Sequence, residues 1–261
     1  MVREHDHACD HMYDVQFDEA NMILADVRHR LTRDDAQLAM RLIARGDERE
    51  LEQCEAALRD HGIDALLDDP RLINALLSAP QGAHSSFPLF AYVAVRHALH
   101  EAGEENRALA DYMAAIVIAF GAKGRADRVG DADDERYDTL AALIGDANDP
   151  DARRSFLVRA HLGNYALWLA GLFPDFIVQR RWKKGGPDLD YYDEMGKRGF
   201  QLAADHRLAD EHGLRALYAL AAARFETMRA ALNNVSDRML FPNVHTPERL
   251  MRQVATGFRL Q

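Results

Sequence analysis

Signals that begin and end helices recur along this chain, whereas the pattern of a β-strand does not occur. Asp47 stands three residues before Glu50, which is the spacing of a helix-capping box, and Gly62 closes the segment that follows. A capping side chain comes directly before a proline at Asp69-Pro70, Asp149-Pro150 and Thr246-Pro247. No stretch alternates apolar and polar residues between turn dipeptides. The chain is therefore predicted to be all-α.

Two segments are apolar on every side of the helix that each is expected to form. The predicted helix 105–121 contains MAAIVIAF, and the predicted helix 150–172 contains YALWLAGLF. Because a helix without a polar face must be surrounded by other helices, these two are expected at the centre of a multi-helix bundle. Segment 213–233 is expected to form one further uninterrupted helix.

The first 80 residues are more charged, and their predicted helices are more clearly amphipathic. We expect 1–80 to form an N-terminal helical subdomain, which could serve as a dimerisation arm. The main bundle is expected over 85–261. Between them, the sequence SAPQGAHSSFP is rich in turn-forming residues and marks the boundary.

Composition and charge argue against several classes of protein. The chain has 32 Lys and Arg against 42 Asp and Glu, and this net charge of −10 makes a general nucleic-acid binder unlikely. Two cysteines, Cys9 and Cys54, are too few for a disulfide framework. The start of the chain has no apolar signal segment, and the longest apolar runs, 113–120 and 166–173, fall far short of the ~20 residues of a transmembrane segment. A soluble, cytoplasmic protein is expected, and the predominance of Arg over Lys with abundant Ala suggests a bacterial one.

One candidate metal site lies at the start of the chain. Imidazole and thiolate groups alternate with aspartates there, at His5, His7, Cys9 and His11. These groups are the usual ligands of zinc, nickel and copper, so the segment could hold a divalent transition metal. The alternative is a chain end that binds metal only in vitro. None of the common catalytic motifs occurs, including the phosphate-binding loop, the serine nucleophile elbow, CxxC and HExxH.

The region 154–194 holds the strongest candidate for a ligand site. His161, Asn164 and Tyr165 recur at helical spacing on one face of an otherwise apolar helix. Downstream, a second group combines charge and aromatic character, at Arg180, Arg181, Tyr191 and Tyr192. In the functional interpretation, His161 and Asn164 floor a pocket, the tyrosines wall it, and the arginines attract a small anionic ligand.

A structural interpretation competes with that pocket. His161 and Asn164 would then hydrogen-bond neighbouring helices, because an unmatched buried polar group costs about 1–3 kcal/mol. The basic cluster RRWKK at 180–184 would be a solvated helix end that complements the helix dipole. A third interpretation has this cluster, with Trp182 among its cations, dock on a phosphate-bearing or membrane surface.

These observations support three hypotheses about function. The favoured one is a non-enzymatic interaction or regulatory protein that forms a homodimer or binds a protein partner. The alternative is a sensor or enzyme with a small-molecule pocket around His161 and Asn164 and a basic rim. A further alternative is a metal-dependent protein that uses the N-terminal His and Cys ligands.

Overall fold

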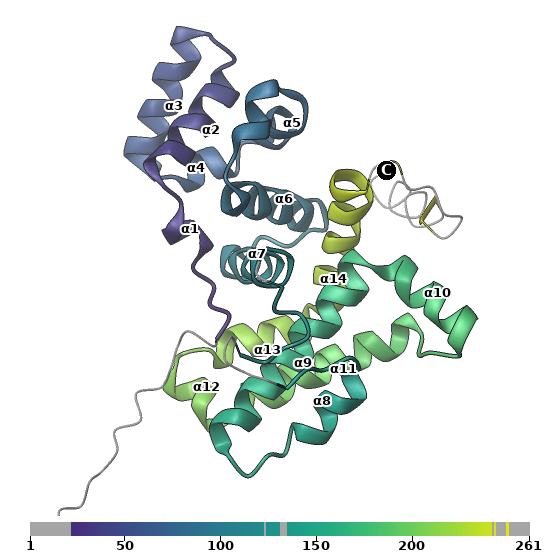
Figure 1. Cartoon of the computed structure of the whole chain (residues 1–261). Helices are drawn as coiled ribbons and strands as arrows, with labels where there is room; N and C mark the ends of the chain where they lie inside the picture. The colour runs from purple at the N-terminus through teal and green to yellow at the C-terminus, as the bar shows by residue number, and fades with distance from the viewer. Residues whose placement is uncertain (1–21, 123, 131–134, 242, 244–248, 251–261) are drawn as a thin grey trace, which may run out of the picture.

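The computed structural model describes residues 22–122, 124–130, 135–241, 243 and 249–250, and all regular structure in these ranges is helical (Figure 1). The predicted all-α fold is confirmed. The first half of the chain forms α1 (Val27–Arg30), α2 (Arg33–Ala44), α3 (Glu48–His61), α4 (Asp64–Leu67), α5 (Pro70–Ser78), the 3₁₀ segment η2 (Pro80–His84), α6 (Phe87–Glu101) and α7 (Arg107–Gly121). The second half forms α8 (Leu140–Asp146), α9 (Ala152–Leu172), α10 (Pro174–Lys184), α11 (Leu189–Ala204), α12 (Arg207–Glu211), α13 (Arg215–Ala223), α14 (Phe225–Val235) and the π-helical turn η3 (Ser236–Leu240).

The helices begin where side chains satisfy the free backbone N–H groups of the first turn. The carboxylate of Asp47 accepts a hydrogen bond from the N–H of Arg49 at 2.8 Å, so the predicted cap of α3 is confirmed. Asp69 caps α5 in the same way. Helix α9 begins later than the dipeptide Asp149-Pro150 predicts. The carboxylate of Asp149 accepts from the N–H of Asp151, and the side chain of Asp151 caps the helix.

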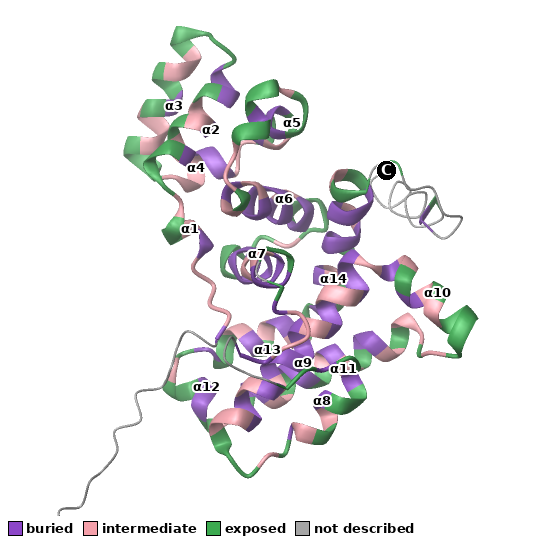
Figure 2. Ribbon diagram, in the orientation of Figure 1, coloured by how far each residue is buried: buried purple, intermediate pink, exposed green. Residues whose placement is uncertain are grey.

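Helices α7 and α9 are buried along much of their length (Figure 2). Helix α7 packs on α1, α6, α9 and α13, while α9 packs on α7, α8, α10, α11, α12 and α14. Met113 of α7 and Phe156 of α9 have no exposed surface. Neighbouring helices therefore cover the apolar surface that both sequences carry all round.

Helices α9 and α11 approach closely because glycine faces glycine where they meet. A methyl group on Gly199 would lie 2.5 Å from the backbone nitrogen of Gly163. A methyl group on Gly163 would in turn lie 2.6 Å from the ring of Phe200. The contact between these two helices leaves no space for a side chain at either glycine.

The expectation of one helix over 213–233 is wrong. Helices α13 and α14 are separated at Arg224, whose φ of −107° and ψ of 13° lie outside the helical range. The break allows the ring of Phe225 to occupy the space beside Gly196 of α11, where a methyl group would lie 2.2 Å from that ring. Close contact with α11 therefore overrides the local preference of this segment for a continuous helix.

Helices α2 to α5 form a group of their own at one end of the molecule (Figure 1). Helix α2 packs on α3, α4 and α5, and α5 packs on α6. Helix α1 packs instead on α6 and α7. The expected boundary near residue 80 coincides with η2, and the independence of the first 80 residues as a subdomain stays a prediction.

A network of ion pairs joins this N-terminal group to α6 and α7. The carboxylate of Asp68, directly after α4, binds Arg96 of α6 at 2.8 Å and also binds Arg107 of α7. Burial opposes ionisation of Asp68, but hydrogen bonds from these two arginines outweigh it and lower the pKa of the carboxyl group. Arg96 also binds Glu105, at 3.0 Å. Because the Arg96 side chain is only 4% exposed, its charge must be compensated by these two carboxylates.

Candidate functional site

His161 lies in the interior, where its ring is already committed to the protein. Its Nε2 is 3.1 Å from the carbonyl oxygen of Ala126, and its ring stacks on Tyr165 at a centroid distance of 6.0 Å. Burial lowers the pKa of His161 to about 4, so the ring is neutral at pH 7 and donates its Nε2–H to Ala126. The cavity beside His161 measures about 10 Å³, which is room for at most one water molecule.

Asn164 is committed in the same way. Its Oδ1 accepts a hydrogen bond of 2.6 Å from the hydroxyl of Tyr112, which lies fully buried on α7. The Tyr112 ring meets Tyr218 edge to face at 5.9 Å. His161 and Asn164 thus bind the backbone at Ala126 and the hydroxyl of Tyr112, as the structural interpretation of the sequence expects of buried polar groups. The pocket around them stays a prediction, for which the described residues leave very little space.

The other predicted ligand-site residues separate into two groups. Burial raises the pKa values of Tyr165 and Tyr192, and the positive charge of Arg180 offsets part of this increase. Tyr191 meets Tyr192 edge to face at 6.0 Å. Arg181 instead pairs with Asp188 at 3.1 Å. Asp188 also accepts a hydrogen bond from the backbone N–H of Tyr191, so Arg181 lies at the start of the same helix. A ligand site formed by these arginines and tyrosines stays a prediction.

The predicted metal ligands His5, His7, Cys9 and His11 lie outside the described residues. Within the described ranges, no three or more His, Cys, Asp or Glu side chains gather in a way that would hold a metal ion. The divalent transition metal accordingly stays a prediction for the N-terminal segment.

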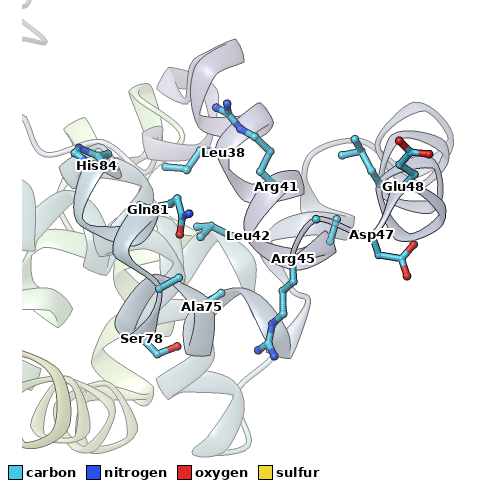
Figure 3. A pocket seen from close by; sticks show the side chains of 14 residues that line it. Leu38, Arg41, Leu42, Arg45, Asp47, Glu48, Ala75, Ser78, Gln81 and His84 are labelled. Atoms are coloured by element: carbon cyan, nitrogen blue, oxygen red, sulfur yellow. The ribbon is translucent and has the colours of Figure 1, made fainter.

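A groove that the sequence did not point to lies between α2 and α5 (Figure 3). Its volume is about 760 Å³, against about 10 Å³ beside His161. Helix α2 lines it with one face, at spacings of three and four, through Leu38, Arg41 and Leu42, and Arg45 follows directly after the helix. The opposite wall and the ends come from Ala75, Ser78, Ala79, Gln81, His84, Asp47, Glu48 and Leu51. We call this feature the α2–α5 groove.

The groove lies at the edge of the contact between α2 and α5. Leu42 and Ala75 are buried in that contact and form the floor. The half-buried Leu38 and Ala79 and the exposed Ser78 border the open volume above it. The chain turns sharply at the end of α2, where Arg45 has a left-handed φ of 50°. After this turn, Asp47 and the first turn of α3, with Glu48 and Leu51, border one end of the groove.

The cations of the α2–α5 groove have no acidic partner among the described residues. Arg41 and Arg45 are exposed, and Arg41 donates only one long hydrogen bond of 3.3 Å, to the backbone oxygen of Gln37. On the acidic side, the carboxylate of Asp47 caps α3, whereas Glu48 is exposed and forms no ion pair with a described residue. The groove therefore offers an apolar floor with unpaired charges of both signs at its edge.

The chain matches no protein-family model, no curated protein and no solved structure. Among the helices of the described ranges, none is long and apolar enough to cross a membrane. Inference about function therefore rests on geometry, and the α2–α5 groove is the strongest candidate. The only trace of the groove in the sequence is a pair of segments: small residues recur at helical spacing over 75–79, and leucine and arginine recur over 38–45.

Proposed function

We propose that this chain is a non-enzymatic protein-interaction module that forms a homodimer. In the dimer, the α2–α5 groove of each copy receives an amphipathic helix of the other copy. The observation that carries the proposal is the open, apolar-floored volume of about 760 Å³, bordered by Arg41 and Arg45, which form no ion pair with a described residue. Recognition of an amphipathic helix by an apolar groove is a common mode of protein association.

The shape of the groove supports a helix as the occupant. The small side chains of Ser78 and Ala79 allow close approach of a second backbone. The half-buried Leu38 supplies the apolar contact that a leucine-rich helix face would bury, above the buried Leu42 and Ala75. Burial of apolar surface at about 25 cal/mol per Å² would be the main favourable contribution to association.

The charges support a second copy of the chain as the source of that helix. In an interface with twofold symmetry, a contact between one residue of the first copy and another residue of the second copy occurs twice, with the two copies exchanged. Arg45 and Glu48 lie within one groove and carry opposite charges, so two copies related by a twofold axis can exchange ion pairs. Two copies that each carry a net charge of −10 repel one another, so association depends on local pairing of Arg41 and Arg45 with acidic groups of the partner.

Sedimentation velocity of the full chain over a wide concentration range tests the proposal. We expect a dimer that Leu38→Glu and Arg45→Glu each convert to monomer, since both place acidic charge in the groove. Leu77→Glu is the matched control, because Leu77 is 49% exposed on α5 and does not line the groove. A monomer at every concentration, or equal effects of Leu38→Glu and Leu77→Glu, would contradict the proposal. Circular dichroism of each variant verifies that the helices are intact.

A small anionic ligand at Arg180 is the second candidate function. Its support is that Arg180 forms no ion pair with a described residue and lies near the half-buried Tyr165 and the buried Tyr192. Native mass spectrometry of untagged protein is expected to find a retained mass that Arg180→Ala removes. The absence of a retained mass from the wild-type chain would count against this function without bearing on self-association.

A further inference from the structure

Helix α10 projects from the body of the molecule (Figure 1). It packs on α9 and α11, with Pro174 and Ile177 as its buried residues. On its outer side, Trp182 is 83% exposed and Phe176 is 51% exposed. The two residues are six positions apart, which is about 120° around the helix, so one surface laid against the outer side of α10 can meet both. Large exposed aromatic side chains are unfavourable in water and mark a surface that meets another phase or molecule.

Apolar surface continues from α10 onto its neighbours. The ring of Phe173, directly before α10, contacts Phe241 at a centroid distance of 6.0 Å, and Leu240 and Phe241 are each 37% exposed. On another side, α10 and the start of α11 border an open hollow of about 580 Å³, which Trp182 lines together with apolar residues and the charged Arg181, Asp188 and Asp190. The apolar surface of α10 thus continues toward Leu240 and Phe241, and the hollow on the other side is of mixed character.

Positive charge accompanies these aromatic residues. Lys183 and Lys184 are exposed in the last turn of α10 and form no ion pair with a described residue. The half-buried Arg180 likewise has no acidic partner among the described residues, whereas Arg181 is neutralised by Asp188 at 3.1 Å. We use the name α10 patch for the two aromatic residues and the three unpaired cations: Phe176, Trp182, Arg180, Lys183 and Lys184.

We propose that the α10 patch docks this protein on the surface of an anionic lipid membrane. Tryptophan and phenylalanine partition into the interfacial region of a bilayer, where an apolar ring contacts acyl chains and a polar edge stays hydrated. The neighbouring cations meet the phosphate and carboxylate groups of anionic lipids. The charge of the patch is opposite in sign to the net charge of −10 of the chain, so docking orients the molecule with α10 toward the membrane.

A nucleic acid fits the α10 patch less well than a membrane. Binding of a phosphate backbone draws its affinity from many cations along one face, and this patch offers three that form no ion pair with a described residue. The extension of apolar surface to Leu240 and Phe241 suits acyl chains rather than a hydrated backbone. The inference does not depend on the α2–α5 groove, which lies on other helices.

Co-sedimentation of the full chain with vesicles tests the proposal. We expect binding at low salt to phosphatidylcholine vesicles that contain about 30 mol% phosphatidylserine, and much weaker binding to pure phosphatidylcholine. The double variant Lys183→Glu/Lys184→Glu is expected to lower affinity at least about 30-fold, because each cation near such a surface contributes roughly a fivefold increase. The control Arg33→Glu/Arg49→Glu changes the net charge equally at exposed residues of α2 and α3 and is expected to keep binding within about threefold of wild type.

Fluorescence gives an independent measurement, since Trp168 and Trp182 are the two tryptophans of the chain. In a Trp168→Phe background, the emission of Trp182 is expected to shift to shorter wavelength with anionic vesicles and to stay unchanged with a mixed-sequence oligonucleotide. No binding to the anionic vesicles, equal binding by the Lys183→Glu/Lys184→Glu variant, or binding of the oligonucleotide alone would overturn the proposal.

Discussion

The interior around His161 and the α2–α5 groove both combine polar with apolar side chains, but they differ in how much space surrounds those side chains. In the interior, polar groups bind Ala126 and Tyr112 at hydrogen-bond distance, and the cavity is about 10 Å³. In the groove, Arg41 and Arg45 have no acidic partner among the described residues, and the volume is about 760 Å³. A polar residue on a buried helix therefore indicates a hydrogen-bond partner before it indicates a ligand.

Helix contacts explain the contrast between these two regions. Glycines at 163 and 199 bring α9 and α11 together until no side chain fits between them. In the N-terminal group, Ala75 and Leu42 are buried where α2 and α5 pack together, whereas the half-buried Leu38 and the exposed Ser78 border open volume. Small residues allow two helices to meet closely, and a groove remains where no further helix covers the edge of that contact.

The largest expected effect comes from forcing the closed region open. Gly199→Ala places a methyl group 2.5 Å from the backbone nitrogen of Gly163, and neither backbone can yield without moving a helix. We expect a loss of about 3 kcal/mol or more in the free energy of unfolding, measured by urea denaturation. Gly145→Ala, where a methyl group meets nothing within 4 Å, is the control and is expected to be neutral or stabilising. Equal behaviour of the two variants would mean that α9 and α11 are not in close contact.

Acid is expected to weaken the interior next. The folded pKa of His161 is about 4, below its value of about 6.5 in an unfolded chain, because burial disfavours the charged ring. Between these values the unfolded state binds the proton more readily, so stability is complete above pH 6.5 and is lost as the pH falls toward 4. The expected loss is roughly 2–3 kcal/mol. Urea denaturation of wild type and His161→Gln from pH 7 to 4 measures it, and parallel profiles would refute this origin.

The ion pairs between the N-terminal group and α6 are expected to have a smaller effect. Asp68→Asn leaves the buried Arg96 with Glu105 as its remaining acidic partner, at 3.0 Å. We expect a loss of about 2 kcal/mol in the free energy of unfolding, because Asp68 is itself about one quarter exposed and solvent screens part of the interaction. Arg238→Gln breaks an exposed ion pair with Glu101 and is expected to cost less than about 1 kcal/mol. A cost of Asp68→Asn no larger than that of the exposed pair would show that the network does not stabilise the fold.

The sequence predicted the fold class because helix caps and the absence of strand patterns are local features. The caps of α3 and α5 are where the sequence indicates them. The break at Arg224 was missed, since it depends on contact between Phe225 and Gly196, which are distant in sequence. The α2–α5 groove was missed for the same reason. A groove is a property of the distance between helices, and no single segment of the sequence contains that distance.

The smallest expected effect separates a binding surface from the core. Leu38 is half-buried at the groove, whereas Leu162 on α9 has no exposed surface. Leu38→Ala should cost the dilute monomer less than about 1 kcal/mol, because water already reaches this side chain, against about 3 kcal/mol for Leu162→Ala. At high concentration the cost of Leu38→Ala increases if the groove is the interface, since the substitution then also removes apolar contact with the second copy. Thermal unfolding at both concentrations measures this, and an effect of Leu38→Ala that stays constant with concentration would assign Leu38 to the fold alone.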